Sequence, residues 1–138
     1  PLPMYSTDDI LINVFTEIVI PALKKFNPSV LILQGGVDGY FMDPLTHLEY
    51  TSYGYRKISD LLRTLRVPVV VLGGGGYYIE HVPILWLNIV LTLVGEHNEY
   101  KNILDINSEP STCKGEICNR AERIITKIKK FHPFFNNL

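Results

Sequence analysis

The stretch PVVVLGGGGY, residues 68–77, decides the fold. Its first half is apolar and rich in β-branched valine, which is typical of a strand buried on both faces of a parallel sheet. Four glycines then end the strand abruptly. Because such a run costs much backbone entropy, we expect a loop in which the backbone must turn sharply or approach another group closely.

A second apolar run, Val30–Leu33, lies upstream and is closed by Gly35 and Gly36. It also predicts a strand buried on both faces. The residues between the two runs predict a helix, with one apolar stripe formed by Tyr55, Ile58, Leu62 and Leu65. A strand–helix–strand order predicts a parallel pair with a right-handed crossover, and hence an α/β fold. Since two strands are too few for a stable open sheet covered on both faces, we expect the other strands to lie outside this chain.

Helices are predicted on both sides of this unit. The first begins after Thr7, with Asp8 and Asp9 in its first turn, and Pro21 is expected to kink it or end one of its sections. Residues 84–94 predict a buried helix and residues 96–111 a polar surface connection. Residues 116–130 predict an amphipathic helix whose inward positions are Ile117, Ala121, Ile124, Ile125 and Ile128.

Composition excludes several classes of protein. The 138 residues carry 13 basic and 14 acidic side chains, a net charge of −1, which argues against direct nucleic-acid binding or a membrane-surface footprint. No apolar stretch is long enough for a membrane span and no signal peptide is visible, so we expect a cytoplasmic protein.

The chain begins with proline, and we expect a processed or truncated start. Cys113 and Cys118 are interpreted as ordinary thiols, with a disulfide or a metal site as alternatives.

Two unusual loops follow the predicted strands, at the edge where sites form in parallel sheets. Asp38 in the first loop suits a metal or a cationic group, and the alternative is a turn aspartate that bonds its own backbone. In the second loop, Tyr77 can donate its hydroxyl to a developing oxyanion. The alternatives are a packed aromatic side chain on a flexible turn and, less well supported by the pattern, a phosphate-binding loop. For His47 in the first loop we favour a structural role.

The two loops together resemble the histone deacetylase superfamily. VLGGGGY, residues 71–77, resembles the segment with the active-site tyrosine, and QGGVD followed by DPL, residues 34–45, resembles the metal-binding loop. Residues 46–48 and 51–55 are most similar to the prokaryotic, acetoin-utilisation branch. The resemblance implies a three-layer α/β/α fold of the arginase/deacetylase type, present here only in part. Residues 1–138 would then be the C-terminal part of one domain, with a core at 1–95, a surface connection at 96–115 and a last helix and tail at 116–138.

The same resemblance implies roles for individual residues. Asp38 matches a zinc-binding aspartate, and Tyr77 matches the tyrosine that polarises the acyl carbonyl. Leu45 matches a residue that lines the acyl-lysine tunnel, and Gly75 and Gly76 match glycines of its wall. The implied cofactor is zinc, and the implied substrate is an acylated lysine or a small acylated amine.

The departures from the family pattern concern the rest of the site. The family's D-x-H segment and its adjacent His-His pair are absent from this sequence, Gly35 stands where relatives often have His or Cys, and Met42 stands where glycine is usual. We therefore expect a missing N-terminal half to supply the other zinc ligands, and the chain by itself to be inactive. The alternative is a non-catalytic, deacetylase-like scaffold, which the bulky segment Gly39–Met42 favours.

Overall fold

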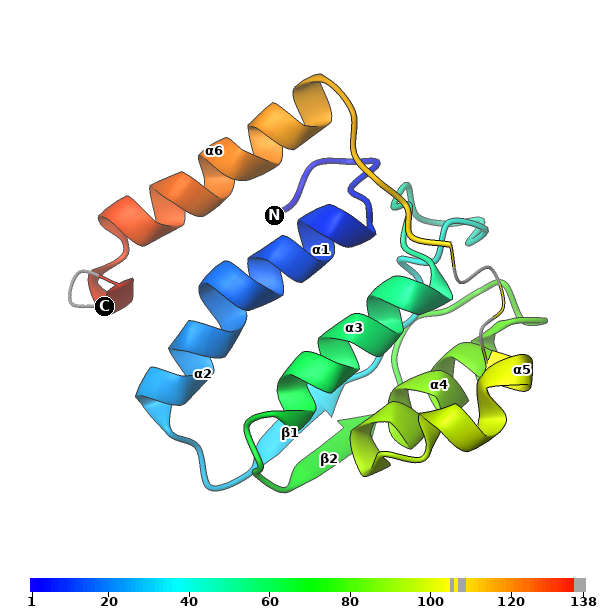
Figure 1. Ribbon diagram of the computed structural model, residues 1–138. Coiled ribbons are helices and arrows are strands. Elements are labelled where there is room, and N and C mark those ends of the chain that lie inside the picture. The colour runs from blue at the N-terminus through cyan, green and yellow to red at the C-terminus, as the bar shows by residue number, and fades with distance from the viewer. Residues whose placement is uncertain (105, 107–108, 136–138) are drawn as a thin grey trace.

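The computed structural model describes residues 1–104, 106 and 109–135. Its long helices lie in a layer on one side of a small sheet (Figure 1). In chain order the elements are α1 (Asp8–Val14), η1 (Phe15–Val19), α2 (Ile20–Phe26), β1 (Leu31–Gln34), α3 (Ser52–Arg63), β2 (Val69–Leu72), α4 (Val82–Val94), η2 (His97–Tyr100), α5 (Lys101–Leu104), α6 (Glu116–Phe131) and η3 (Pro133–Phe135).

The first helical segment changes its winding before Pro21. The chain is α-helical over α1, π-helical over η1 and α-helical again over α2, with Pro21 in the first turn of α2. The backbone stays in the right-handed helical region through Val19 and Ile20, and the π-helical turn directly precedes Pro21, whose missing N–H cannot continue the α-helical hydrogen-bond ladder. The predicted interruption near Pro21 is therefore confirmed. The helix ends at Asn27, which has a left-handed φ of 52°.

The two strands form the predicted parallel pair. Leu31 lies opposite Val69, and Gln34 lies opposite Leu72. Helix α3 connects them, and Thr51 caps its N-terminus by accepting a hydrogen bond from the backbone N–H of Tyr53. The buried core holds Leu11, Val37, Tyr40, Tyr50, Tyr55, Val82, Leu85 and Ile89.

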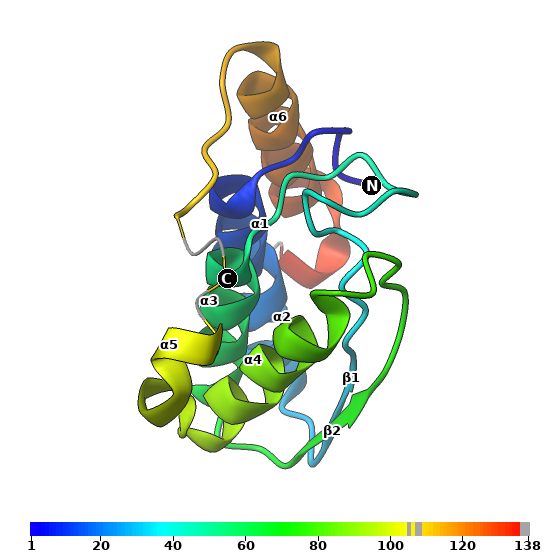
Figure 2. The same ribbon diagram turned by 90° about the vertical axis from the view of Figure 1, so that its right-hand side faces the viewer.

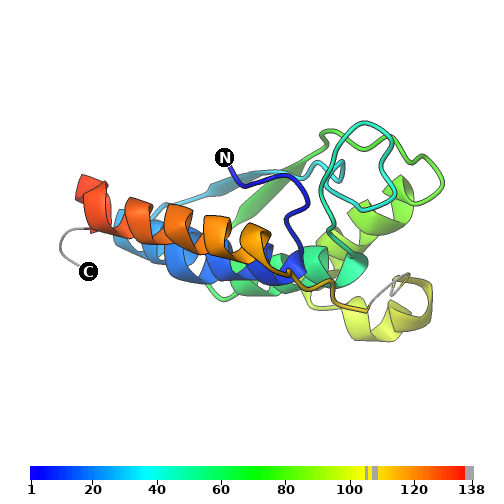
Figure 3. The same ribbon diagram turned by 90° about the horizontal axis from the view of Figure 1, so that it is seen from above.

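The prediction that both strands are buried on both faces is wrong for this chain. Seen from above, helices α1, α2 and α3 lie on one side of the strands, and no helix of the described residues lies on the other side (Figure 3). The side chains of Ile32, Val70 and Leu72 are accordingly 66%, 47% and 50% exposed. Both faces of the strands carry apolar side chains. Within the described residues, however, helices pack against only one of these faces.

Helix α4 was predicted to be buried, and it is only half buried. Leu85 and Ile89 belong to the core, whereas Trp86, Leu87 and Val94 are exposed. Helix α4 packs beside α3 and is followed by the short helices η2 and α5 (Figure 2). The predicted surface connection therefore contains helical turns, and it also buries His97 and Leu104.

The interpretation of Cys113 and Cys118 as ordinary thiols is wrong. They form a disulfide with a Cα–Cα distance of 5.6 Å, which joins the segment before α6 to the first turn of that helix. Gly115 makes the short loop possible, because it adopts a φ of 61° that other residues rarely take.

Helix α6 turns Ala121 and Ile125 inward, as predicted. Within the described residues, no helix is long and apolar enough to cross a membrane.

Candidate functional site

The two site loops begin side by side because β1 and β2 end at the same edge of the sheet. The backbone N–H of Gly35 donates to the carbonyl of Leu72 at 2.9 Å, so the ladder continues one step past β1. Further along, the N–H of Val37 donates to the carbonyl of Gly75 at 2.6 Å. The two loops that follow the predicted strands are therefore neighbours, as two parallel strands that end at one edge imply.

Close packing between the loops explains the glycine tract. A Cβ atom on Gly74 would lie 2.7 Å from the backbone N and Cα of Gly36, and a Cβ on Gly75 would lie 2.5 Å from Oδ2 of Asp38. Gly76 adopts a φ of +150°, where other residues are strained. At Gly73, by contrast, the nearest atom to an added Cβ is 3.8 Å away. Three of the four glycines are thus required by close approach or by conformation.

The Asp38 carboxylate lies against this tract and is half buried. A turn aspartate would accept a hydrogen bond from nearby backbone N–H groups. Within residues 1–104, 106 and 109–135, the carboxylate of Asp38 accepts none. Its oxygens therefore keep their lone pairs for a cation or a donor that this part of the chain does not supply.

Tyr77 follows the tract, and its side chain is 50% exposed. Its backbone N–H donates to Oδ2 of Asp43 at 2.8 Å. Leu45 is 64% exposed, and its N–H donates to Oδ1 of the same carboxylate at 2.9 Å. The structure thus brings Gly75 against Asp38 and Gly76 against Val37, and Asp43 links Leu45 to Tyr77.

Sequence reasoning missed Asp43, although it quoted the motif that contains it. The side chain is 7% exposed, and both carboxylate oxygens are hydrogen-bonded. The bond to the residue two positions on is a common Asx turn, which an aspartate before Pro44 could have indicated. The bond to Tyr77 crosses between loops, so no local pattern predicts it.

The bulky segment Gly39–Met42 turns partly into the core. Tyr40 is 1% exposed, and its hydroxyl forms a 2.9 Å hydrogen bond with Nδ1 of His81. Phe41 and Met42 remain on the surface. His47 is also on the surface, where its carbonyl accepts the N–H of Tyr5 and its ring meets the Tyr5 ring edge-on.

A buried phenol lies beneath the first loop. Burial raises the pKa of Tyr55 well above its ordinary value, and the negative charges of Asp38 and Asp43 raise it further. Its hydroxyl lies 3.1 Å from the position of a Cβ on Gly39. Tyr55 therefore stays neutral and adds no negative charge beneath the loop that carries Asp38.

The residues present do not complete a metal site. Catalytic zinc takes three protein ligands and an open position. In the part of the chain that the structure describes, no three His, Cys, Asp or Glu side chains come together in a way that could hold a metal. Asp38 can supply one ligand, so any zinc bound here needs ligands from elsewhere.

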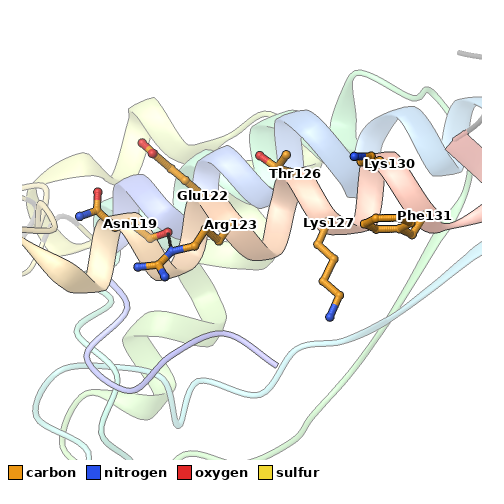
Figure 4. Close-up of a pocket in the computed structure, with 7 residues that line it drawn as sticks. All are labelled: Asn119, Glu122, Arg123, Thr126, Lys127, Lys130 and Phe131. Atoms are coloured by element: carbon orange, nitrogen blue, oxygen red, sulfur yellow. Dashed lines mark hydrogen bonds between the residues drawn. The ribbon is translucent and has the colours of Figure 1, made fainter.

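A hollow of about 500 Å³ lies along α6, away from both loops (Figure 4). Arg123, Lys127 and Lys130 give it a basic character, and Glu122 lies among them. All seven lining residues belong to this one helix. We do not assign it a catalytic role, because all of its lining side chains come from this one surface helix and no residue of either site loop reaches it.

Comparison with known proteins identifies the domain that carries these loops. The family model of the histone deacetylase domain matches residues 1–93. The chain belongs to the histone deacetylase family. It is 33% identical over 102 residues to the acetoin utilization protein AcuC of Staphylococcus xylosus, covering 70% of this chain and 26% of that protein. It is 28% identical over 134 residues to histone deacetylase 14, chloroplastic, of Arabidopsis thaliana, covering 90% of this chain and 31% of that protein.

Solved histone deacetylase structures share the fold. The HD domain of HDA15 superposes with a TM-score of 0.69 at 22% identity, covering 93% of this chain and 32% of the other. The histone deacetylase Clr3 superposes with a TM-score of 0.72 at 20% identity, covering 93% and 20%. The predicted α/β fold of the deacetylase type, present in part, is therefore confirmed. The chain spans about a quarter to a third of the length of the curated relatives named here.

Proposed function

We propose that this chain forms the C-terminal part of a single zinc-dependent deacylase domain, which hydrolyses acetyl-lysine or a small acylated amine. One observation carries the proposal. The Asp38 carboxylate lies against the glycine tract that leads to Tyr77, and no described residue donates a hydrogen bond to it. Metal-assisted amide hydrolysis needs a metal ligand and a donor to the oxyanion, and Asp38 and Tyr77 can supply these two groups.

Each residue has a defined task in this proposal. Asp38 holds the metal together with ligands from outside this chain, and zinc, when bound, supplies Lewis-acid chemistry toward water and the acyl carbonyl. Tyr77 donates its hydroxyl to the oxygen on which negative charge develops. Its exposure of 50% in this chain leaves the ring available to a substrate. Leu45, Gly75 and Gly76 line the path of the acyl chain.

We further propose that residues 1–95 are the core of this part, residues 96–115 the connection, and residues 116–138 the last helix and tail. The chain by itself is inactive, because one carboxylate cannot complete a zinc site. The exposed apolar face with Ile32, Val70 and Leu72 supports the need for a missing N-terminal half, since such a face is normally covered.

Metal stoichiometry tests the proposal. The full-length protein that contains this region is purified, loaded with zinc and analysed for bound metal, beside the variants Asp38→Asn and Asp60→Asn. Asp60 lies exposed on α3 and serves as the matched control. We expect one zinc per chain for the wild type and the control, and far less than one for Asp38→Asn.

A wild-type protein that takes up no stoichiometric zinc would contradict the proposal. That result would instead support the non-catalytic scaffold, which keeps the fold without the metal.

A further inference from the structure

Asp43 connects the two site loops through a single buried carboxylate. Oδ1 accepts the N–H of Leu45 at 2.9 Å, and Oδ2 accepts the N–H of Tyr77 at 2.8 Å. Only 7% of the residue is exposed. Charge-assisted hydrogen bonds of this kind are about twice as strong as neutral ones, so the two N–H groups are held firmly.

The glycine tract makes such an anchor necessary. Four consecutive glycines have many accessible backbone conformations, so the tract alone does not fix the direction in which the chain leaves it. Tyr77 is the first residue after the tract, and its side chain is half exposed, which leaves the ring weakly restrained by packing. The bond from its N–H to Asp43 holds its backbone.

We infer that Asp43 is a positioning residue, which fixes Tyr77 for oxyanion stabilisation and holds Leu45 at the acyl path through the same carboxylate. This inference rests on the proposed function. Asp43 acts through the backbone of the two residues and does not contact the reacting atoms. Its distinctive property is that both oxygens are needed, because each one serves a different loop.

The substitution Asp43→Asn tests this division of labour with little change in volume. One oxygen becomes an NH₂ group, so one of the two backbone N–H donors faces another donor and loses its bond. A misplacement on the order of 1 Å at a catalytic group can lower turnover by about 100-fold. We therefore expect kcat to fall by roughly 10- to 100-fold through Tyr77 and KM to rise through Leu45, while zinc content changes little.

A double-mutant cycle separates positioning from general stability. Kinetics on an acetyl-lysine peptide are measured for full-length wild type, Asp43→Asn, Tyr77→Phe and the double variant, with Asp60→Asn as the exposed control. If Asp43 acts by placing the Tyr77 hydroxyl, its replacement has almost no further effect on kcat once that hydroxyl is gone, and only the KM effect through Leu45 remains. If Asp43→Asn fails to fold, Asp43→Glu is used in the same cycle, because it keeps both oxygens and shifts them by one methylene.

The outcomes are distinct. The inference would be overturned if the losses in kcat multiply in the double variant, or if an Asp43 variant keeps the wild-type kcat. In both cases an active wild type would still support the proposed function. A zinc-loaded wild type with no deacylase activity would overturn the proposed function and this inference with it.

Discussion

The backbone N–H of Val37 donates to the carbonyl of Gly75 at 2.6 Å, and this bond brings the two loops of the site together. It lies next to the point where the Gly75 backbone approaches Asp38 most closely. The position of the Asp38 carboxylate is therefore determined by the absence of a side chain on a residue 37 positions later in the sequence.

The first prediction concerns this contact. Gly75→Ala places a methyl group 2.5 Å from Oδ2 of Asp38, so the carboxylate has to move. In the full-length protein we expect zinc affinity to fall by at least 10-fold, measured by competition with a chelator. Gly73→Ala is the matched control, because its added Cβ meets only the Trp86 ring at 3.8 Å. Equal affinities for the two variants would contradict this account of the glycine tract.

The second prediction concerns the disulfide between Cys113 and Cys118. The Cys113 N–H also donates to the carboxylate of Asp9, so the disulfide ties the start of α6 to α1. Replacing both cysteines with serine should destabilise the protein by about 2 kcal/mol, the value that loop-closure entropy gives for so short a loop. Hydrogen exchange should rise in the first turns of α6. A reductant should produce the same change in the wild type and none in the double variant, and a reductant without effect on the wild type would contradict the assignment.

The third prediction concerns alkaline pH. Burial, with a further contribution from the charge of Asp8, raises the pKa of Tyr50 to about 12 from an ordinary value of 10.0. The folded state then keeps a proton that the unfolded state has lost, so stability is complete below pH 10 and falls as the pH rises toward 12. Urea unfolding at pH 9 and pH 11.5 should show this loss. It should be smaller for Tyr50→Phe than for Tyr5→Phe, whose side chain is exposed. Equal losses in the two variants would rule out Tyr50 as the source.

The fourth prediction concerns Asp8, which is fully buried at the start of α1. Its carboxylate accepts hydrogen bonds from the N–H and the hydroxyl of Thr51 and from the N–H of Ser111. Asp8→Ala leaves three buried or part-buried donors without their acceptor, so we expect a loss on the order of 3 kcal/mol in the free energy of unfolding. Asp60→Ala, on the surface of α3, should cost far less. Similar losses in the free energy of unfolding for Asp8→Ala and Asp60→Ala would contradict the stabilising role of the hydrogen bonds to Asp8.

Much of the fold follows from local patterns in the sequence. The valine run before Gly73 and the leucine-rich run before Gly35 predicted both strands, and their spacing predicted the crossover helix and the parallel pair. These features depend on hydrophobic periodicity and on the glycines that end each apolar run, and both can be recognised within a short stretch of sequence. The neighbouring positions of the two loops then follow from parallel strands that end at one edge.

The sequence failed where a feature depends on tertiary context. The exposed faces of Ile32 and Val70 cannot be predicted, because an apolar strand has the same sequence whether or not a second layer covers it. The disulfide depends on the conformation of Gly115, and the bond from Tyr77 to Asp43 depends on two loops meeting. The roles assigned to Asp38, Tyr77, Leu45, Gly75 and Gly76 stay predictions.

Turnover by Tyr77→Phe tests the central claim most directly. Full-length wild type and the variant are loaded with zinc, and the release of acetate from an acetyl-lysine peptide is measured at saturating substrate. The account predicts equal zinc content and a kcat lowered by about 100- to 1,000-fold, because one oxyanion donor is lost. A variant that binds zinc and turns over substrate at the wild-type rate would contradict the role of Tyr77 and the proposed mechanism.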